Sequence, residues 1–291
     1  MGKTIASDLA AGQIAMVGQA RYQYEHRTLS TQLFTRMTLD PGEKSKYIPK
    51  FGGVTAKDLT DGVDMTEAQS LTITGTTHTT DEAGCKIIIT KKLRSQLKED
   101  AYRAAGKVIG NAMAKKIDQD GLTLFSGLNT ALGAGSATTF SLSYLQAAVT
   151  QCLGQSEPVP EPIVCVVHPY MLHNIVGELA AAASSFADID LHSALKSGLA
   201  QYYRGNEKLF NTAVFATGNI TAVAGTTNCA YGAVFSKSAF IYLVGWEPEN
   251  WLEEDKSLRG FEIGIVADYA MVEEDGTYGR ALAMNLSVPT S

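Results

Sequence analysis

The sequence predicts an α+β protein in which a long extended loop and a long helix precede a compact α/β section. Three consecutive segments carry this prediction: a polar stretch at 39–84, a short apolar strand at 85–90 and one helical pattern over 95–126. Stretches of more than about 15 residues without regular structure are uncommon in compact domains and are usually functional, linkers or disordered. We expect this loop to rest on a neighbouring copy of the chain, which indicates an assembly subunit.

The composition excludes several classes of protein. The 291 residues are enough for one large domain or two smaller ones, with 45% apolar and 19% charged residues. The net charge is −6 and basic runs do not exceed a pair, so a basic stripe for specific nucleic-acid binding is missing. Only weak, non-specific contact with DNA across a broad inner surface stays open.

The cysteines and the apolar runs indicate the environment of the chain. Four widely spaced cysteines match neither a zinc site nor a disulfide scaffold, which predicts buried free thiols. The sequence shows no signal core and no apolar run of about 18 residues, so we expect a soluble intracellular product without membrane contact.

The sequence pattern predicts a thin N-terminal arm with helical tendency over residues 1–36. It predicts a two-stranded flap over residues 37–84. One strand spans 46–51, where Pro49 confines it to a sheet edge, and a Thr-rich strand returns over 70–77. An isolated ribbon is marginally stable in water, so its support should come from outside.

The long helix is predicted from Ser95, a plausible N-cap, to Ser126, a rod of about 48 Å. Lys107 and Lys115 fall outside its apolar stripe. The predicted stripe consists of Leu97, Ala101, Ala104, Val108, Ala112 and Ile117, widened by Ala105, Ile109 and Met113.

In the rest of the chain, predicted helices alternate with predicted strands, and the C-terminal part is β-rich. We expect helices at 142–153, 170–183 and 191–203 and strands at 163–167 and 213–217. Period-two patterns then predict two strands, at 261–271 and 282–288, joined as a hairpin by the acidic turn 273–276.

No catalytic constellation is found, and no cofactor or metal is expected. The glycine-rich segment 133–138 lacks the ending of a phosphate-binding loop, and His168 and His173 stand five apart without ligand companions. The acidic runs 253–255 and 273–275 are interpreted as solvated turns, with a cation site between subunits as the alternative.

The order of segments resembles the major capsid protein of tailed bacteriophages, the Hong Kong 97-type capsid fold, over the whole chain. Short phrases fit this resemblance: Ile117-Asp118-Gln119-Asp120, Phe125-Ser126-Gly127, Val167-His168-Pro169 and the segment 233–239. The resemblance implies an N-terminal arm (1–36), an extended β-hairpin loop (37–84), a β-rich peripheral domain with a spine helix (85–130 and 236–291) and an α/β axial domain (131–235).

The resemblance also implies partners and contacts. Copies of the chain would form hexamers and pentamers of an icosahedral head around double-stranded DNA, assembled in the host cytoplasm. Separate scaffolding, portal and decoration proteins are the further partners that the resemblance allows. Since an arm of about 36 residues leaves no room for a built-in scaffolding segment, any scaffolding would have to be a separate protein. The residues expected to contact a neighbouring subunit are Lys46, Lys50, Phe51, Lys57, Asp61 and Asp64.

Two alternatives stay open at this point. The first is the shell protein of a bacterial encapsulin-type nanocompartment, which would co-purify with a cargo protein. The second is a cytoplasmic α+β enzyme with no readable site, which would elute as a small oligomer in sizing chromatography.

Overall fold

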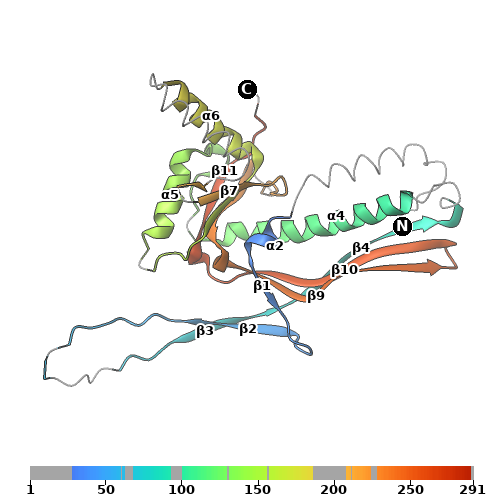
Figure 1. Cartoon of the computed structure of the whole chain (residues 1–291), viewed down its shortest axis with the longest axis horizontal. Helices are drawn as coiled ribbons and strands as arrows, with labels where there is room; N and C mark the ends of the chain where they lie inside the picture. The colour runs from blue at the N-terminus through green and yellow to red at the C-terminus, as the bar shows by residue number, and fades with distance from the viewer. Residues whose placement is uncertain are drawn as a thin grey trace.

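The computed structural model describes residues 28–59, 61–62, 68–92, 100–129, 131–155, 157–185, 208–210, 212–223 and 228–289. Their strands form a four-stranded sheet, a five-stranded sheet and a separate two-stranded ribbon (Figure 1). The predicted arm up to residue 27, the cap at Ser95 and the helix at 191–203 lie outside the described residues.

The four-stranded sheet is long and narrow. Its order is β1-β9-β10-β4, with β1 at Thr35–Thr38, β9 at Phe240–Asp255, β10 at Gly260–Glu273 and β4 at Asp81–Thr90. The predicted strand at 85–90 is confirmed, but it starts earlier, because its first residues pair with the 266–269 segment of β10. The alternation predicted for β10 is also confirmed by the burial of Ile265, Ala267 and Tyr269.

The long helix runs along this sheet (Figure 1). Helix α4 spans Asp100–Thr123 and continues as a 3-10 turn, η2, over Leu124–Gly127. Its buried stripe in the described part is Ala105, Ile109, Met113 and Ile117. The predicted stripe was wrong in its centre: Val108 and Ala112 are only half-buried. Ile109 lies next to β4, and its carbonyl accepts from the Cys85 thiol at 3.8 Å. The helix therefore packs on the sheet through the side that carries residues 105, 109 and 113.

The five-stranded sheet forms a compact layer with two helices (Figure 1). Strand β5 is buried at every position, as expected for a central strand between covered faces. The predicted helices at 142–153 and 170–183 and the strands at 163–167 and 213–217 are confirmed. The sheet order is β11 (Gly279–Asn285), β8 (Cys229–Ser236), β5 (Ile163–Val167), β7 (Thr212–Ala216) and β6 (Lys208–Leu209), and the helices are α5 (Leu142–Leu153) and α6 (Pro169–Ser185).

The predicted C-terminal hairpin is wrong. Strand β10 is occupied on both sides by β9 and β4, so β11 has no edge to pair with there and joins β8 in the other sheet. The acidic turn after β10 therefore connects two sheets. The predicted alternation at 282–288 is also wrong: β11 is buried on both faces from Gly279 to Met284, whereas Val288 is exposed.

A cluster of four phenylalanines joins the two large sheets. Phe34 follows the short helix α2 (Ser30–Leu33), Phe125 lies in η2, and Phe235 and Phe240 lie at the end of β8 and the start of β9. Ring centroids are 4.7 Å apart for Phe34–Phe240 and 5.1 Å for Phe235–Phe240, the range of favourable aromatic pairs. All four side chains are at most 1% exposed, so this cluster fixes the sheets to each other.

A fully buried carboxylate, Asp118 of α4, lies at the same junction. Its Oδ1 accepts from the backbone amides of Leu29 and Ser30 and from the Ser30 hydroxyl, each at 2.8 Å. Its Oδ2 accepts from the side-chain amide of Asn219, Nδ2, at 2.7 Å. Four hydrogen bonds offset the cost of burying this charge. Asp118 thus connects the end of the arm to the long helix.

Candidate intersubunit surface

The two-stranded ribbon projects from the body of the subunit (Figure 1). It consists of β2 (Ser45–Phe51) and β3 (Ile73–Thr79), paired antiparallel with Phe51 opposite Ile73. The predicted flap is confirmed, and Pro49 sits in a strand that pairs on one side only. Because such a ribbon buries little surface by itself, further contacts must stabilise it.

One face of the ribbon is apolar and exposed. Successive side chains of a strand point to opposite faces, so Tyr47 and Phe51 share one face, together with Ile73. Their exposed fractions are 53%, 60% and 56%. Of the ten large apolar side chains exposed among the described residues, six lie in the ribbon and its tip: these three and Val54, Leu59 and Leu71. An exposed apolar patch of this kind is typical of an interaction surface; we call it the outer face.

A glycine shapes the outer face. A Cβ on Gly75 would lie 2.6 Å from the Tyr47 ring and 2.4 Å from the Ile48 carbonyl oxygen, so only glycine fits there. The tyrosine ring packs across the bare backbone of the opposite strand, which covers a glycine that would otherwise weaken the ribbon. Tyr47 is therefore held in place while half of its surface remains exposed.

The opposite, inner face of the ribbon carries polar and basic residues and faces the acidic turn after β10. Between them is a hollow of about 180 Å³ lined by Ile48, Lys50, Thr74, Gly75, Thr76, His78 and Glu274. The Lys50 ammonium forms an ion pair with Asp275, whose side chain is only 7% exposed. The inner face is thus directed toward the subunit's own body.

The pKa values of the three carboxyl groups in the acidic turn, at residues 273–275, are shifted from their ordinary values. Burial, and then the charge of Asp275, raises the pKa of Glu273 and of Glu274. Burial alone would raise the pKa of Asp275 too, but hydrogen bonds from Lys50 and Thr277 lower it below its ordinary value. The turn is therefore no freely solvated loop, contrary to the interpretation from sequence.

The six predicted contact residues fall into different environments. Lys46 donates to the Thr38 carbonyl at 2.9 Å and lies 3.7 Å from the Asp40 carboxylate, within the ribbon's own base. Lys50 faces inward, Phe51 lies on the outer face, and Lys57 and Asp61 are exposed toward the tip. Asp64 lies outside the described residues. Their contact with a neighbour stays a prediction.

Sequence reasoning missed Tyr47 and Ile73 as members of the outer face. The signal was available in part: Tyr47, Pro49 and Phe51 alternate with Lys46 and Lys50, the pattern of a strand with one apolar face, which only Ile48 interrupts. Ile73 could not be assigned, because its placement depends on the register with β2.

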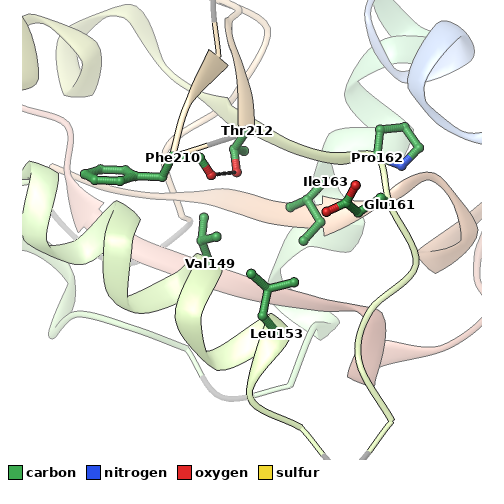
Figure 2. A pocket seen from close by; sticks show the side chains of 7 residues that line it. All are labelled: Val149, Leu153, Glu161, Pro162, Ile163, Phe210 and Thr212. Carbon is green, nitrogen blue, oxygen red and sulfur yellow. Dashed lines mark hydrogen bonds between the residues drawn. The ribbon is translucent and has the colours of Figure 1, made fainter.

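A second hollow lies beside α5, and Figure 2 shows its lining. It encloses about 280 Å³ between Val149, Leu153, Ile163, Pro162, Glu161, Phe210 and Thr212. The Thr212 hydroxyl donates to the Phe210 carbonyl at 3.4 Å, so it is not paired with a base that could activate it. The described residues contain no cluster of three or more metal-ligating side chains.

The histidine at position 168, the cysteines and the helices also bear on the predictions from sequence. His168 accepts from the Tyr170 amide at 3.2 Å and packs against the Tyr170 ring, so its imidazole caps and packs against the start of α6. The four cysteines are free, as predicted; Cys85 is half-buried and the other three are buried. None of the helices in the described residues is long and apolar enough to cross a membrane.

Comparison with known proteins identifies the fold. Neither a family model nor a curated protein matches the sequence. The chain is similar to a solved structure of Mycobacterium phage Che8, with a TM-score of 0.67 and 16% identity over 88% of this chain and 91% of the other. It is also similar to the capsid of cyanophage P-SCSP1u (TM-score 0.66, 14% identity, 90% and 89% covered).

A third similar structure is the acid-stable capsid of Helicobacter pylori bacteriophage KHP30, with a TM-score of 0.69 and 10% identity over 88% of each chain. The likeness spans nearly the whole length of each of these proteins. The predicted α+β fold of the tailed-phage capsid type is confirmed.

Proposed function

We propose that the chain is the major capsid subunit of a tailed bacteriophage, a structural protein that assembles with its own copies into the hexamers and pentamers of an icosahedral head. The observation that carries this proposal is the outer face of the β2–β3 ribbon, which presents Tyr47, Phe51 and Ile73 to solvent on a chain with a capsid fold. A second copy of the chain is the partner that would cover these side chains.

The ribbon suits the mechanical task of a shell subunit. It adds contact area at a distance from the core, so each contact can bury apolar surface without changing the fold of the subunit. Interfaces repeated around closed rings act together, and the shell is held firmly although each contact is modest.

The proposal divides the subunit between its two large sheets. The peripheral domain, proposed as 85–130 and 236–291, would contain α4 and most of the four-stranded sheet, to which β1 and the start of β4 also belong. The axial domain, proposed as 131–235, would also include β11, because this strand pairs with β8. The extended loop, proposed as 37–84, would consist mainly of the residues between β1, which ends at Thr38, and β4, which begins at Asp81.

The proposed partners follow from the same role. The shell would enclose double-stranded DNA, with weak and non-specific contacts because the net charge is −6. Purified capsomers should therefore lose DNA binding at physiological salt, and tight binding to one DNA sequence would contradict this part. Separate scaffolding, portal and decoration proteins, a virion location, assembly in the host cytoplasm and the absence of catalysis remain parts of the proposal.

The alternatives have less support. The encapsulin-type shell shares the subunit role, but the similar structures named above come from phages. The enzyme alternative lacks any observed group of cooperating catalytic side chains among the described residues.

The proposal is tested by removing the ribbon. Residues 45–79 are replaced with a short Gly/Ser turn, and the full chain and the variant are compared by negative-stain microscopy and thermal denaturation. We expect the full chain to form shells, and the variant to unfold cooperatively but form none, because the ribbon contributes little to the core. Shells from the variant, or a full chain that elutes only as a small oligomer, would overturn the proposal.

A further inference from the structure

The inner face of the ribbon meets its own subunit at a charged contact. Lys50 lies near the end of β2, and its ammonium pairs with Oδ2 of Asp275 in the turn between the two large sheets. The lysine side chain is 53% exposed, whereas that of the aspartate is 7% exposed. A buried carboxylate needs such a partner, because an uncompensated buried charge is strongly unfavourable.

The Asp275 carboxylate is fixed by its own turn before the ribbon contributes. Its Oδ1 accepts from the Thr277 amide at 3.0 Å and from the Thr277 hydroxyl at 2.7 Å, which leaves Oδ2 for Lys50. The turn is also held from outside, since the amides of Glu274 and Asp275 donate to the Ala239 carbonyl and the Asn129 amide donates to the Gly276 carbonyl. The ribbon therefore docks on a rigid acceptor.

A second contact lies a few residues further along the ribbon. A Cβ on Gly53 would come within 2.9 Å of Oε1 of Glu157, so the chain after β2 passes close to the segment between α5 and β5. The ribbon thus touches its own body at two consecutive places, both on the side of the five-stranded sheet. These two contacts together fix the orientation of the ribbon relative to the body, which the ribbon could not fix by itself because it has no core of its own.

The charges around the contact make Lys50 the decisive cation. The body contributes Glu157, Glu273, Glu274 and Asp275, and the inner face of the ribbon contributes Lys46, Lys50 and His78. Lys46 is already engaged at the ribbon's base with Asp40 and the Thr38 carbonyl, and His78 pairs with the Thr76 hydroxyl at 2.8 Å. Lys50 is the cation that the structure pairs with the acidic turn.

We propose that Lys50 and Asp275 form an ionic latch that holds the ribbon in one direction against its own subunit before assembly. With the inner face latched, the outer face with Tyr47 and Phe51 is the side available to a partner. A pre-set ribbon loses less conformational freedom when it binds, which favours association. This benefit for assembly rests on the proposed function, whereas the latch itself is a property of the single subunit.

The latch is tested by hydrogen exchange on dissociated, full-length subunits, with the amides of β2 and β3 as the readout. The variants are Lys50→Gln, Asp275→Asn and the double variant; asparagine keeps an oxygen for Thr277. Lys46→Gln is the matched control, a lysine of the same strand and face whose partners lie at the ribbon's base. We expect Lys50→Gln to speed exchange in β2 and β3 roughly threefold to tenfold, and the control to speed it less than about twofold.

Two further results are expected from a true latch. Lys50→Gln should have no additional effect in the Asp275→Asn background, because the pair is already broken. Exchange of β2 and β3 in the unmodified chain should rise between about 0.05 and 1 M salt, and this rise should be much smaller in Lys50→Gln. The amides of β5 report whether each variant still folds.

Equal exchange in Lys50→Gln and the unmodified chain would overturn the latch, as would equal effects of the two lysine substitutions. If a variant also exposes β5, the salt series on the unmodified chain decides, and a salt-independent ribbon contradicts the latch. None of these readouts needs a shell. A chain with a salt-sensitive latch that never assembles would instead count against the proposed function alone.

Discussion

Strand β5 and strand β2 use apolar residues in opposite ways. In β5 every residue from Ile163 to Val167 is buried between covered faces, so its apolar side chains stabilise the subunit. In β2 the apolar residues Tyr47 and Phe51 are more than half exposed, on a strand with one partner and no core. The difference is the one that the proposed contact outside the subunit requires: apolar surface that the subunit's own core does not use.

The comparison also separates two kinds of stability. Substitutions in the body should lower the free energy of unfolding of the subunit, whereas substitutions on the outer face should leave it nearly unchanged and affect association. Three sets of substitutions and one pH series either separate these two kinds of residue or show that the separation is wrong.

The largest loss is expected on the buried line of α4. Ile109→Asp would place a charge against the sheet and should cost several kcal/mol, which approaches the total stability of a domain. Lys107→Asp, on the exposed side, should stay within about 0.5 kcal/mol. Val108→Asp should fall between them, because Val108 is half-buried. Thermal denaturation of dissociated subunits gives the order, and a larger loss for Val108 than for Ile109 would mean that the helix is rotated.

A pair of phenylalanines compares body and ribbon directly. Phe240→Ala removes a ring from the four-phenylalanine cluster and should lower subunit stability by about 3–5 kcal/mol. Phe51→Ala removes an exposed ring and should change it by less than about 0.5 kcal/mol, while reducing the yield of shells. Urea unfolding and sedimentation measure the two effects. A large loss of subunit stability in Phe51→Ala would show that the outer face is covered within the subunit.

The junction at Asp118 should give a somewhat smaller loss. Asp118→Ala leaves the Leu29 and Ser30 amides and the Asn219 side chain without their acceptor, at a cost of about 3 kcal/mol. Asp120→Ala is the matched control, two residues further along α4. The Asp120 carboxylate is partly exposed, accepts from the Tyr269 hydroxyl and forms an ion pair with Lys116. Urea unfolding should give a much larger loss in the free energy of unfolding for Asp118→Ala than for Asp120→Ala. Equal losses would contradict the structural role assigned to Asp118.

The smallest effect concerns pH. Burial, and then the charge of Asp275, raises the pKa of Glu273 and of Glu274, so their protonation on mild acidification removes partly buried charges, relieves repulsion in the turn and favours the folded state. The Asp275 pKa is lowered, so its stabilising contribution is present above the ordinary aspartate value of about 3.9 and is lost as pH falls through its own pKa. Hydrogen exchange of β2 and β3 should therefore slow or stay level, relative to its intrinsic rate, from neutral pH to about 5 and accelerate below about 4. A steady acceleration from neutral pH downward would contradict this assignment.

Much of the fold could be predicted from the sequence because local patterns and tertiary structure agree there. The run at 163–167 is apolar at every position, and the 142–153 helix has a clear apolar face, so both elements were found. The hairpin between β10 and β11 was predicted wrongly because an acidic turn between two alternating strands has the same local pattern whether the strands pair or separate. The strands β9 and β4, which occupy both edges of β10, decide between these outcomes.

The candidate site was predictable in outline and not in detail. The length and polarity of 37–84 indicated an extended flap, and Phe51 lies on its exposed face. The roles of Lys46 and Lys50 could not be distinguished, because they share a strand face and differ only in what lies beneath. Asp275 is more than 200 positions away in the chain, and it comes close to Lys50 because the ribbon docks on the turn between β10 and β11.

The central claim, that the outer face contacts a second copy of the chain, is tested most directly by crosslinking at position 51. A photo-crosslinking amino acid replaces Phe51 in chains labelled with either light or heavy nitrogen, the two preparations are mixed before assembly, and the crosslinked peptides are analysed by mass spectrometry. Particles assembled separately and then mixed are the control. If the outer face contacts a second copy, we expect abundant light–heavy crosslinked peptides from the mixed assembly and none from the control. Crosslinks confined to peptides of the same label in the mixed assembly would show that the outer face contacts its own chain and would contradict the account.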